Sequence, residues 1–404
     1  MSETAVFNPF EPGYVEDPYG QFAALRASDP VHETPFGAWY VTRYADVLRL
    51  LRDPALSVDD ANAAPTLMSA FAEEVLGPDA NRDRNQSMLD RDPPDHTRLR
   101  RLVSRAFTPR RIGELRERIQ ALVDDKLDVA ADAGRMELIG DLAFPLPFEV
   151  ISEMLGLPET DRDQIRDWSG IVVRSLEPVP DPDLLRRIQE AADNLSGLVQ
   201  ELIAWKRTHP DDKILTSLIE AEENGDVLTD EELVGQVLLL FIAGHETTVN
   251  LIGNGTLALL RHPDQLALLR DDPDLIGNAV EELLRYDAPV QMTRRINVAE
   301  VEVGGRTIPA GTFIVAALAS ANLDEAHFGP TASTLDLGRS DASEHLAFGG
   351  GVHYCLGAAL AKMEAQVAIG SLVHRFPEVA AAGEPTYNGR INLRGLEHLE
   401  LALR

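Results

Sequence analysis

Apolar positions recur with a helical period over most of the chain. From Asp95 to about Leu284 they return every three or four residues, with breaks at several prolines. The longest helix is predicted to begin after Thr229, which forms a capping box with Glu232, and to end at about Leu260. About thirty residues at 1.5 Å each span roughly 45 Å, enough to cross a whole domain. Apolar residues occur on nearly every face of this helix, so we expect it to be buried.

Alternating apolar positions predict a few short strands beside these helices. They lie at residues 39–42, 301–303, 306–308 and 312–316, and at the alternating leucines of 399–403. No internal repeat and no proline- or glycine-rich linker divides the chain. The pattern therefore predicts one domain, residues 1–404, of mainly α structure with small β-sheets (α+β).

A second helix is predicted from Asp272 and Pro273 to about Tyr286. Glu282 lies at the edge of its apolar stripe, and Arg285 is its neighbour on the helix surface. A partly buried pair of this kind is costly unless fully hydrogen-bonded, so we interpret it as a structural lock rather than a catalytic pair. The adjacent Glu281 is expected to point toward solvent.

The central helix carries an unusual polar group in its middle. The sequence Ala243-Gly244-His245-Glu246-Thr247-Thr248 places a glycine, an acid and two hydroxyls inside an otherwise apolar helix. One interpretation is a satisfied polar cluster in the core. The other is a widened turn that offers an acid and an alcohol to a ligand. A zinc-binding H-E-x-x-H motif is excluded because its last position is Val249.

The only cysteine, Cys355, follows three glycines and precedes a helix. Unpaired N–H groups at a helix start favour the thiolate, and glycines let a flat ligand approach the backbone. Such a thiolate suits a metal ion with one open position, although a buried inert cysteine is the alternative. A single cysteine allows no intrachain disulfide, so a reducing cytoplasm is expected.

The net charge of −29 argues against a nucleic-acid partner. The first four residues have no features of a signal peptide, and the longest apolar run is far below the roughly 20 residues of a membrane span. Six arginines nevertheless cluster within fourteen residues: Arg98, Arg100, Arg101, Arg105, Arg110 and Arg111. They form either a solvated face paired with acids or a docking patch for an acidic partner.

Four segments, in this order and spacing, resemble the cytochrome P450 superfamily. His96 and Arg100 follow Asp92-Pro93-Pro94 as in the bacterial pattern that holds haem propionates; residues 243–248 resemble the oxygen-activation helix; Glu282 and Arg285 resemble the E-x-x-R helix. The fourth resembles the haem-binding signature: Phe348-Gly349-x-Gly351-x-His353-x-Cys355-x-Gly357-x-x-Leu360-Ala361-x-x-Glu364.

The resemblance implies the cytochrome P450 fold, with haem b between the long central helix and the cysteine-bearing loop. Cys355 would be the axial iron ligand, Phe348 would shield its sulfur, and N–H groups near Gly357 would tune it. Thr247 and Glu246 would deliver protons. The propionates would be neutralised by His96, Arg100, Arg295 and His353.

The activity that it implies is that of a haem-thiolate monooxygenase. One oxygen atom from O2 would enter an apolar small molecule by hydroxylation or epoxidation, with secondary metabolism as one setting. Electrons would come from a ferredoxin and its reductase, the ferredoxin docking on the arginine cluster. A haem-binding sensor or carrier without turnover is the alternative, against which the pair of Glu246 and Thr247 argues.

The position of the motifs also predicts residues around the substrate. We expect these to be Met88, Leu89, Ala243, Gly244, Thr248, Val290, Gln291, Met292 and residues 393–396, with Arg394 as an anchor for a polar or anionic group.

One departure from the family pattern concerns the lock. Thr334 stands where an arginine that joins Glu282 and Arg285 is expected. Either Arg339 or His345 supplies the missing partner, or the lock has two members only.

Overall fold

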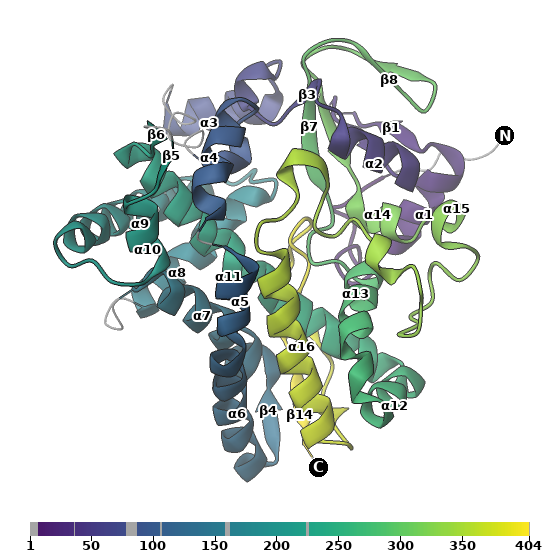
Figure 1. Ribbon diagram of the computed structural model, residues 1–404. Helices are drawn as coiled ribbons and strands as arrows, with labels where there is room; N and C mark the ends of the chain where they lie inside the picture. Colours follow the sequence, from purple (N-terminus) through teal and green to yellow (C-terminus); the bar gives the residue numbers. More distant parts are fainter. Residues whose placement is uncertain are drawn as a thin grey trace.

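Helices make up most of the chain and surround one long central helix (Figure 1). The computed structural model describes residues 7–35, 37–77, 87–105, 107–157, 162–223 and 226–403, so the amino-terminal residues used above lie outside it. The α-helices are α1 (Tyr19–Ser28), α2 (Tyr44–Arg52), α3 (Leu67–Leu76), α4 (Asp95–Ser104), α5 (Pro109–Glu114), α6 (Arg116–Ala133), α7 (Pro145–Leu155), α8 (Arg162–Val172), α9 (Pro182–Thr208), α10 (Ile214–Ile219), α11 (Asp230–Arg261), α12 (Pro263–Asp271), α13 (Ile276–Tyr286), α14 (Leu318–Asn322), α15 (Glu325–Phe328) and α16 (Ala358–Arg375).

The strands form small sheets at the edges of this helical body. The largest has the order β1-β2-β10-β7-β3, in which β10 runs parallel to β2 and antiparallel to β7. The strands are β1 (Val31–Glu33), β2 (Trp39–Val41), β3 (Leu56–Ser57), β4 (Arg135–Glu137), β5 (Glu222–Glu223), β6 (Asp226–Val227), β7 (Thr293–Asn297), β8 (Val301–Val303), β9 (Arg306–Ile308), β10 (Phe313–Ala316), β11 (Ala380–Ala381), β12 (Thr386–Tyr387), β13 (Leu396–His398) and β14 (Glu400–Ala402). The predicted mainly helical fold with small sheets is confirmed.

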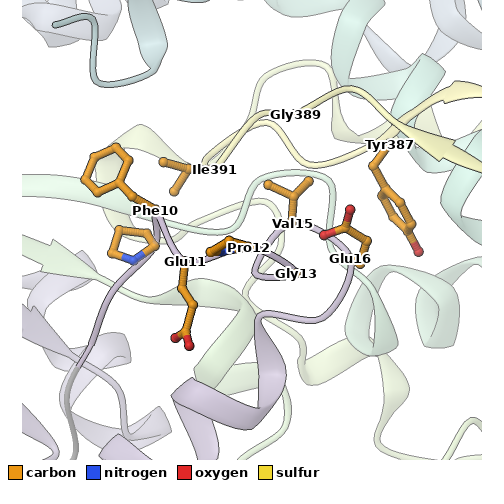
Figure 2. Close-up of a pocket in the computed structure, with 10 residues that line it drawn as sticks. Phe10, Glu11, Pro12, Gly13, Val15, Glu16, Tyr387, Gly389 and Ile391 are labelled. Atoms are coloured by element: carbon orange, nitrogen blue, oxygen red, sulfur yellow. The ribbon is translucent and has the colours of Figure 1, made fainter.

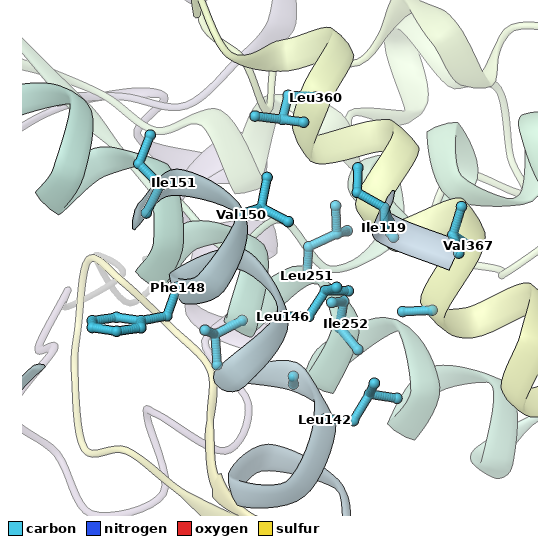
Figure 3. Close-up of a cluster of buried hydrophobic side chains, with 14 of the residues drawn as sticks. Ile119, Leu142, Leu146, Phe148, Val150, Ile151, Leu251, Ile252, Leu360 and Val367 are labelled. Carbon is cyan, nitrogen blue, oxygen red and sulfur yellow. The ribbon is translucent and has the colours of Figure 1, made fainter. Parts of the chain in front are cut away.

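The central helix α11 begins and ends as its sequence predicts. The Thr229 hydroxyl accepts the Glu232 N–H, and the Glu232 carboxylate accepts the Thr229 N–H. Leu251 and Ile252 are buried and lie between Val150 of α7 and Val367 of α16 (Figure 3). The packing on both sides explains why α11 needs apolar residues around its circumference. No helix in the described ranges combines the length and apolar character that crossing a membrane requires.

The second predicted helix starts differently from its prediction. Asp272 caps a short 3-10 turn, η7 (Pro273–Leu275), and α13 proper begins only at Ile276. The Leu275 N–H bonds to the Asp272 carbonyl, an i→i+3 bond that tightens this first turn.

The lock on α13 has a third member, and it is Arg339. Glu282 accepts two hydrogen bonds from Arg285, at 2.6 and 2.8 Å, and one from Arg339 Nε at 3.3 Å. Glu282 and Arg285 are completely buried. The guanidinium groups also donate to carbonyls of the segment before the cysteine loop, including that of Thr334. Arg339 therefore makes the contact with Glu282 that the family pattern assigns to an arginine at position 334.

The other candidate, His345, serves a different acid. Its Nε2 lies 3.0 Å from Glu281, which Lys362 of α16 also contacts at 2.8 Å. The expectation that Glu281 points into solvent is wrong, because these two partners from distant segments cover it.

Candidate functional site

The loop before α16 needs glycine for its path. Gly349 and Gly351 have φ of 70° and 66°, which side chains rarely adopt. A Cβ at Gly351 would also collide with the Leu51 carbonyl of α2. The Cys355 N–H bonds back to the Phe348 carbonyl at 3.0 Å, which closes the loop. The glycines therefore fix where the thiol is presented.

The thiol of Cys355 is exposed, yet protein surrounds it densely enough for burial to dominate its chemistry. Burial raises the pKa of Cys355, while N–H groups of Gly357 and Ala358 and the charge of Arg100 oppose that rise. The prediction that N–H groups at the helix start favour the thiolate is confirmed in direction, but burial outweighs their effect. A metal cation at the sulfur would reverse this balance, since a coordinating thiol is deprotonated.

The four basic residues expected around the propionates do come together. The rings of His96 and His353 lie 4.2 Å apart, and Arg100 on α4 donates to the Tyr354 carbonyl at 2.7 Å. Burial, followed by the fields of His96, Arg295 and Arg100, lowers the pKa of His353 to about 3. Burial likewise lowers the pKa of Arg295 to about 10. The four basic side chains therefore lie close together in a part of the protein that is partly shielded from water.

Among the residues that the structure describes, basic groups outnumber acids in this cluster. Both ring nitrogens of His96 are buried without a hydrogen-bond partner among the described residues. Asp92 is the acid that acts on His96 and Arg295, and it also accepts the Val58 N–H. Buried polar groups normally find partners, so a ligand with its own carboxylates suits this site. Haem b, with two propionates and an iron for Cys355, fits the residues present.

A second face of the site lies on α11. Ala243 is exposed although the helix around it is buried, Gly244 and Thr247 are half-buried, and the Thr247 hydroxyl donates to the Ala243 carbonyl at 2.9 Å. The helix stays α-helical through this turn, so the expected widening is absent from α11. An exposed alanine inside a core helix indicates a hollow next to it.

The acid beside Thr247 is held by a residue that the sequence did not suggest. Glu246 forms an ion pair with Arg390, a residue of the turn between β12 and β13. The Glu246 side chain is only 10% exposed, so it is largely shielded from water. The neighbouring His245 is fully buried, with Nδ1 2.9 Å from the Phe241 carbonyl and Nε2 3.8 Å from the Glu246 carboxylate, and burial lowers its pKa.

Two predicted pocket residues are committed elsewhere. Arg394 is 3% exposed, pairs with Asp287 and donates to the Val15 and Glu16 carbonyls, so it is no free anchor for substrate. Thr248 is buried and interacts with the Glu364 carboxyl of α16. Both side chains bind segments of the fold together.

The remaining pocket residues have mixed environments. Met88 is buried and Leu89 is 47% exposed, both within one 3-10 turn. Val290 is half-buried and bridges to Leu393. Gln291 and Met292 are buried, the first donating to the Ala288 carbonyl and the second packing in a core cluster with Phe7 and Phe22. Met292 is therefore a core residue rather than a free lining residue.

The arginine cluster divides into two groups. Residues that hydrogen-bond inside the protein are Arg98, Arg100, Arg110 and Arg111. Arg101 on α4 and Arg105 at its C-terminal end are exposed, and Val352 and Tyr354 of the cysteine loop are about half exposed. The interpretation as a face with internal partners therefore holds for four of the arginines, and the docking patch stays a prediction.

A separate cavity of about 330 Å³ lies away from the cysteine loop, between residues 9–16 and the C-terminal turn (Figure 2). Its walls include Phe10, Val15, Tyr387 and Ile391, none of which was predicted. Neither Cys355 nor Glu246, Thr247 or Ala243 lines it, so it is not the space that Ala243 faces.

Comparison with known proteins gives concordant results. The family model described as Cytochrome P450 matches residues 68–382. Vitamin D(3) 25-hydroxylase of Pseudonocardia autotrophica is 44% identical over 402 residues, covering 98% of this chain and 96% of that protein. 6-Deoxyerythronolide B hydroxylase of Saccharopolyspora erythraea is 38% identical over 395 residues, with 96% of each chain covered.

A solved structure of P450BioI, in complex with an acyl carrier protein ligated to hexadec-9Z-enoic acid, superimposes with a TM-score of 0.89. It is 38% identical and covers 97% of this chain and 100% of that chain.

Proposed function

The chain belongs to the cytochrome P450 family, and from that premise we propose which of its residues carry the reaction. Its relatives are hydroxylases and monooxygenases, and its cofactor is haem b, so the protein is a haem-thiolate monooxygenase. Bound haem b supplies the activation of O2, from which one oxygen atom enters a C–H or C=C bond of the substrate. The other oxygen atom leaves as water, which requires two electrons and two protons.

Cys355 would hold the iron, and four basic groups would hold the propionates. The observation that carries this assignment is the set of His96, Arg100, Arg295 and His353 in one partly dehydrated place. Phe348 would pack beside the sulfur, and N–H groups of Gly357 and Ala358 would lower its basicity. The propionates would give the unpartnered nitrogens of His96 their acceptors.

Glu246 and Thr247 would move the two protons. The Thr247 hydroxyl lies next to the hollow at Ala243, and Glu246 precedes it in the same turn of α11. A hydroxyl can pass a proton on without a net change of charge, and a carboxylate can replace it from solvent. This pair is the reason for preferring an enzyme over a haem-binding sensor or carrier, which needs no proton delivery.

The substrate would be a bulky apolar molecule. The exposed Ala243 brings little side-chain volume to the hollow, while Arg394 is engaged with Asp287 and offers no anchor for an anion. Two relatives are named for hydroxylation of vitamin D3 and of 6-deoxyerythronolide B, both large and mostly apolar. Hydroxylation of a sterol-like or macrolactone compound is therefore the proposed reaction.

Electrons would come from a ferredoxin and its reductase. Arg101 and Arg105 are exposed in the same segment as Arg100, which donates to the Tyr354 carbonyl of the cysteine loop. With the half-exposed Val352 and Tyr354 of that loop, they would form a cationic surface with an apolar centre. Reversing both charges should slow reduction by tenfold or more at low salt, about 1.4 kcal/mol in activation free energy. Arg135→Glu, on β4 at the other end of the molecule, is a control that carries half of this change in net charge (Figure 1). Equal rates for all three proteins would refute this docking surface.

The chain would act as one domain, residues 1–404, in a reducing cytoplasm, which a single unpaired cysteine suits.

Two experiments test the assignment. The reduced protein with carbon monoxide should give the thiolate spectrum, and Cys355→Ser should lose it; an unchanged spectrum would refute the ligand. Thr247→Ala should consume electrons with little product when a surrogate ferredoxin system is supplied. Unchanged product per electron would contradict the role of Thr247 in proton delivery. No product from any of the four test compounds named below would favour a haem-binding sensor.

The panel for substrate binding consists of vitamin D3, 6-deoxyerythronolide B, palmitic acid and a small aromatic compound, scored by the shift in iron spin state. Tightest binding by one of the first two would support the bulky apolar class, whereas tightest binding by the small aromatic compound would contradict it.

A further inference from the structure

The carboxylate of Glu177 holds three successive backbone amides of the C-terminal turn. Its Oε2 accepts the N–H groups of Ile391 at 2.8 Å and Asn392 at 2.9 Å, and its Oε1 accepts that of Leu393 at 2.8 Å. Successive N–H groups that converge in this way form an anion-binding nest. Glu177 follows the short helix η6 (Val173–Leu176), so it belongs to the connection between α8 and α9.

The same turn carries the arginine that binds Glu246. Arg390 immediately precedes the nest, and its Nη1 pairs with the Glu246 carboxylate. The two side chains are only 12% and 10% exposed, so the pair is largely shielded from water. Arg390 Nε is buried without a hydrogen-bond partner in the described part of the chain. With few other bonds to fix it, the guanidinium depends on the turn for its position.

The base of the turn is anchored, whereas one flank of its tip is open. Asn250 and Asn254 of α11 donate to the carbonyls of Leu393 and Arg394, at 3.4 and 3.1 Å. On the other flank lies the cavity of about 330 Å³, with Ile391 in its wall (Figure 2). Asn392 is also held, because its carbonyl accepts the Gln291 N–H at 2.9 Å and its Oδ1 accepts the Met292 N–H at 3.2 Å. The part of the tip that has space to move into if Glu177 lets go is therefore residues 389–391.

We propose that Glu177 positions the acid of the proton pathway at a distance, by holding the turn that places Arg390 against Glu246. Glu177 and Arg390 are positioning residues in this scheme, and neither touches the substrate. When the α8–α9 connection lies against the turn, Arg390 fixes one carboxylate rotamer of Glu246. When it moves away, the nest loses its anion, the tip shifts, and Glu246 loses that support. The inference rests on the proposed role of Glu246.

Hydrogen exchange of the haem-loaded protein tests the first link. In Glu177→Gln an amide NH2 group replaces one acceptor oxygen and faces the backbone N–H donors. The amides of residues 391–393 should therefore exchange about tenfold faster or more, which is the factor expected for the loss of one charge-assisted hydrogen bond. Glu190→Gln, exposed on α9, removes the same charge as a control. Unchanged protection in Glu177→Gln would overturn the proposal. In Arg390→Gln these three amides should stay protected, since their acceptor is intact.

Product formed per NADH tests the second link, with the panel compound that gives the largest spin-state shift. Arg390→Gln and Glu177→Gln should each raise peroxide formation at least threefold, and Arg390→Lys should recover part of the loss. The double variant should be no worse than Arg390→Gln alone, because the two residues act in series. Additive losses would overturn the proposal.

The variant Glu246→Gln separates the two levels of inference. If it leaves product per NADH unchanged, the role of Glu246 is refuted and this proposal falls with it. If it uncouples the reaction while Arg390→Gln and Glu177→Gln do not, only the positioning scheme is refuted.

Discussion

Removal of Arg339 tests whether the lock on α13 has three working members. The side chain is 6% exposed and donates to the Glu282 carboxylate at 3.3 Å and to the carbonyls of Phe328 and Thr331 at 3.2 and 2.7 Å. A hydrogen bond to a charged group contributes about 1.5–3 kcal/mol, and a neutral one about 1 kcal/mol. Arg285 still neutralises Glu282 in the variant, so the loss should lie at the lower end of the about 3–5 kcal/mol of a broken buried ion pair. We expect Arg339→Ala to lower the free energy of unfolding by about 3 kcal/mol.

Equilibrium unfolding in urea, followed by circular dichroism, measures this loss. Arg270→Ala is the matched control, because Arg270 pairs with Asp271 at the surface, where 40% of one side chain and 71% of the other are exposed. Surface pairs contribute about 0–1 kcal/mol, so its midpoint should hardly move. A loss below about 0.5 kcal/mol in Arg339→Ala would refute the three-membered lock. With that outcome, the haem content of Arg339→Ala should also match that of the wild type.

Further predictions concern the pH response, the loop and the hollow. Burial raises the pKa of Glu364 to about 8 from 4.5, so the folded state holds its proton more tightly and stability falls as pH rises from 4.5 to 8. Glu364→Gln should match the wild type near pH 4.5 and be more stable by roughly 4 kcal/mol near pH 7.5 in urea unfolding; a pH-independent difference would contradict this. Gly351→Ala should lower haem incorporation, because its Cβ meets the Leu51 carbonyl, whereas Gly170→Ala, with open space around it, should not. Ala243→Phe should fill the hollow and weaken the spin-state response at least about tenfold while the carbon monoxide spectrum persists; unchanged binding would place the substrate elsewhere.

Local sequence signals predicted the elements that depend on local physics. The capping box at Thr229 and the proline after Arg261 set the ends of α11, and the hairpin of β8 and β9 has its predicted bounds. These features need only neighbouring residues: a side chain that accepts the first N–H groups, or two glycines with positive φ at the turn.

Two of the misses have a common cause, because both depend on contacts between residues distant in sequence. Arg390 meets Glu246 across 144 positions, and Lys362 meets Glu281 across 81. No periodicity records such pairs. At Cys355 the effect of the helix start was visible in the sequence, but the burial that outweighs it comes from the whole fold.

The residues that break local rules in the folded chain are the ones the motifs selected. An alanine is exposed in a core helix at Ala243, an imidazole lacks partners at His96, and a thiol is exposed yet desolvated at Cys355. A fold selected for stability alone would fill the space beside Ala243, give His96 hydrogen-bond partners and cover the thiol of Cys355. All three become ordinary once a large, flat, dianionic ligand with a metal centre lies among them. The defects are therefore stronger evidence for the haem site than any one motif, because they come from the packing and not from the signature.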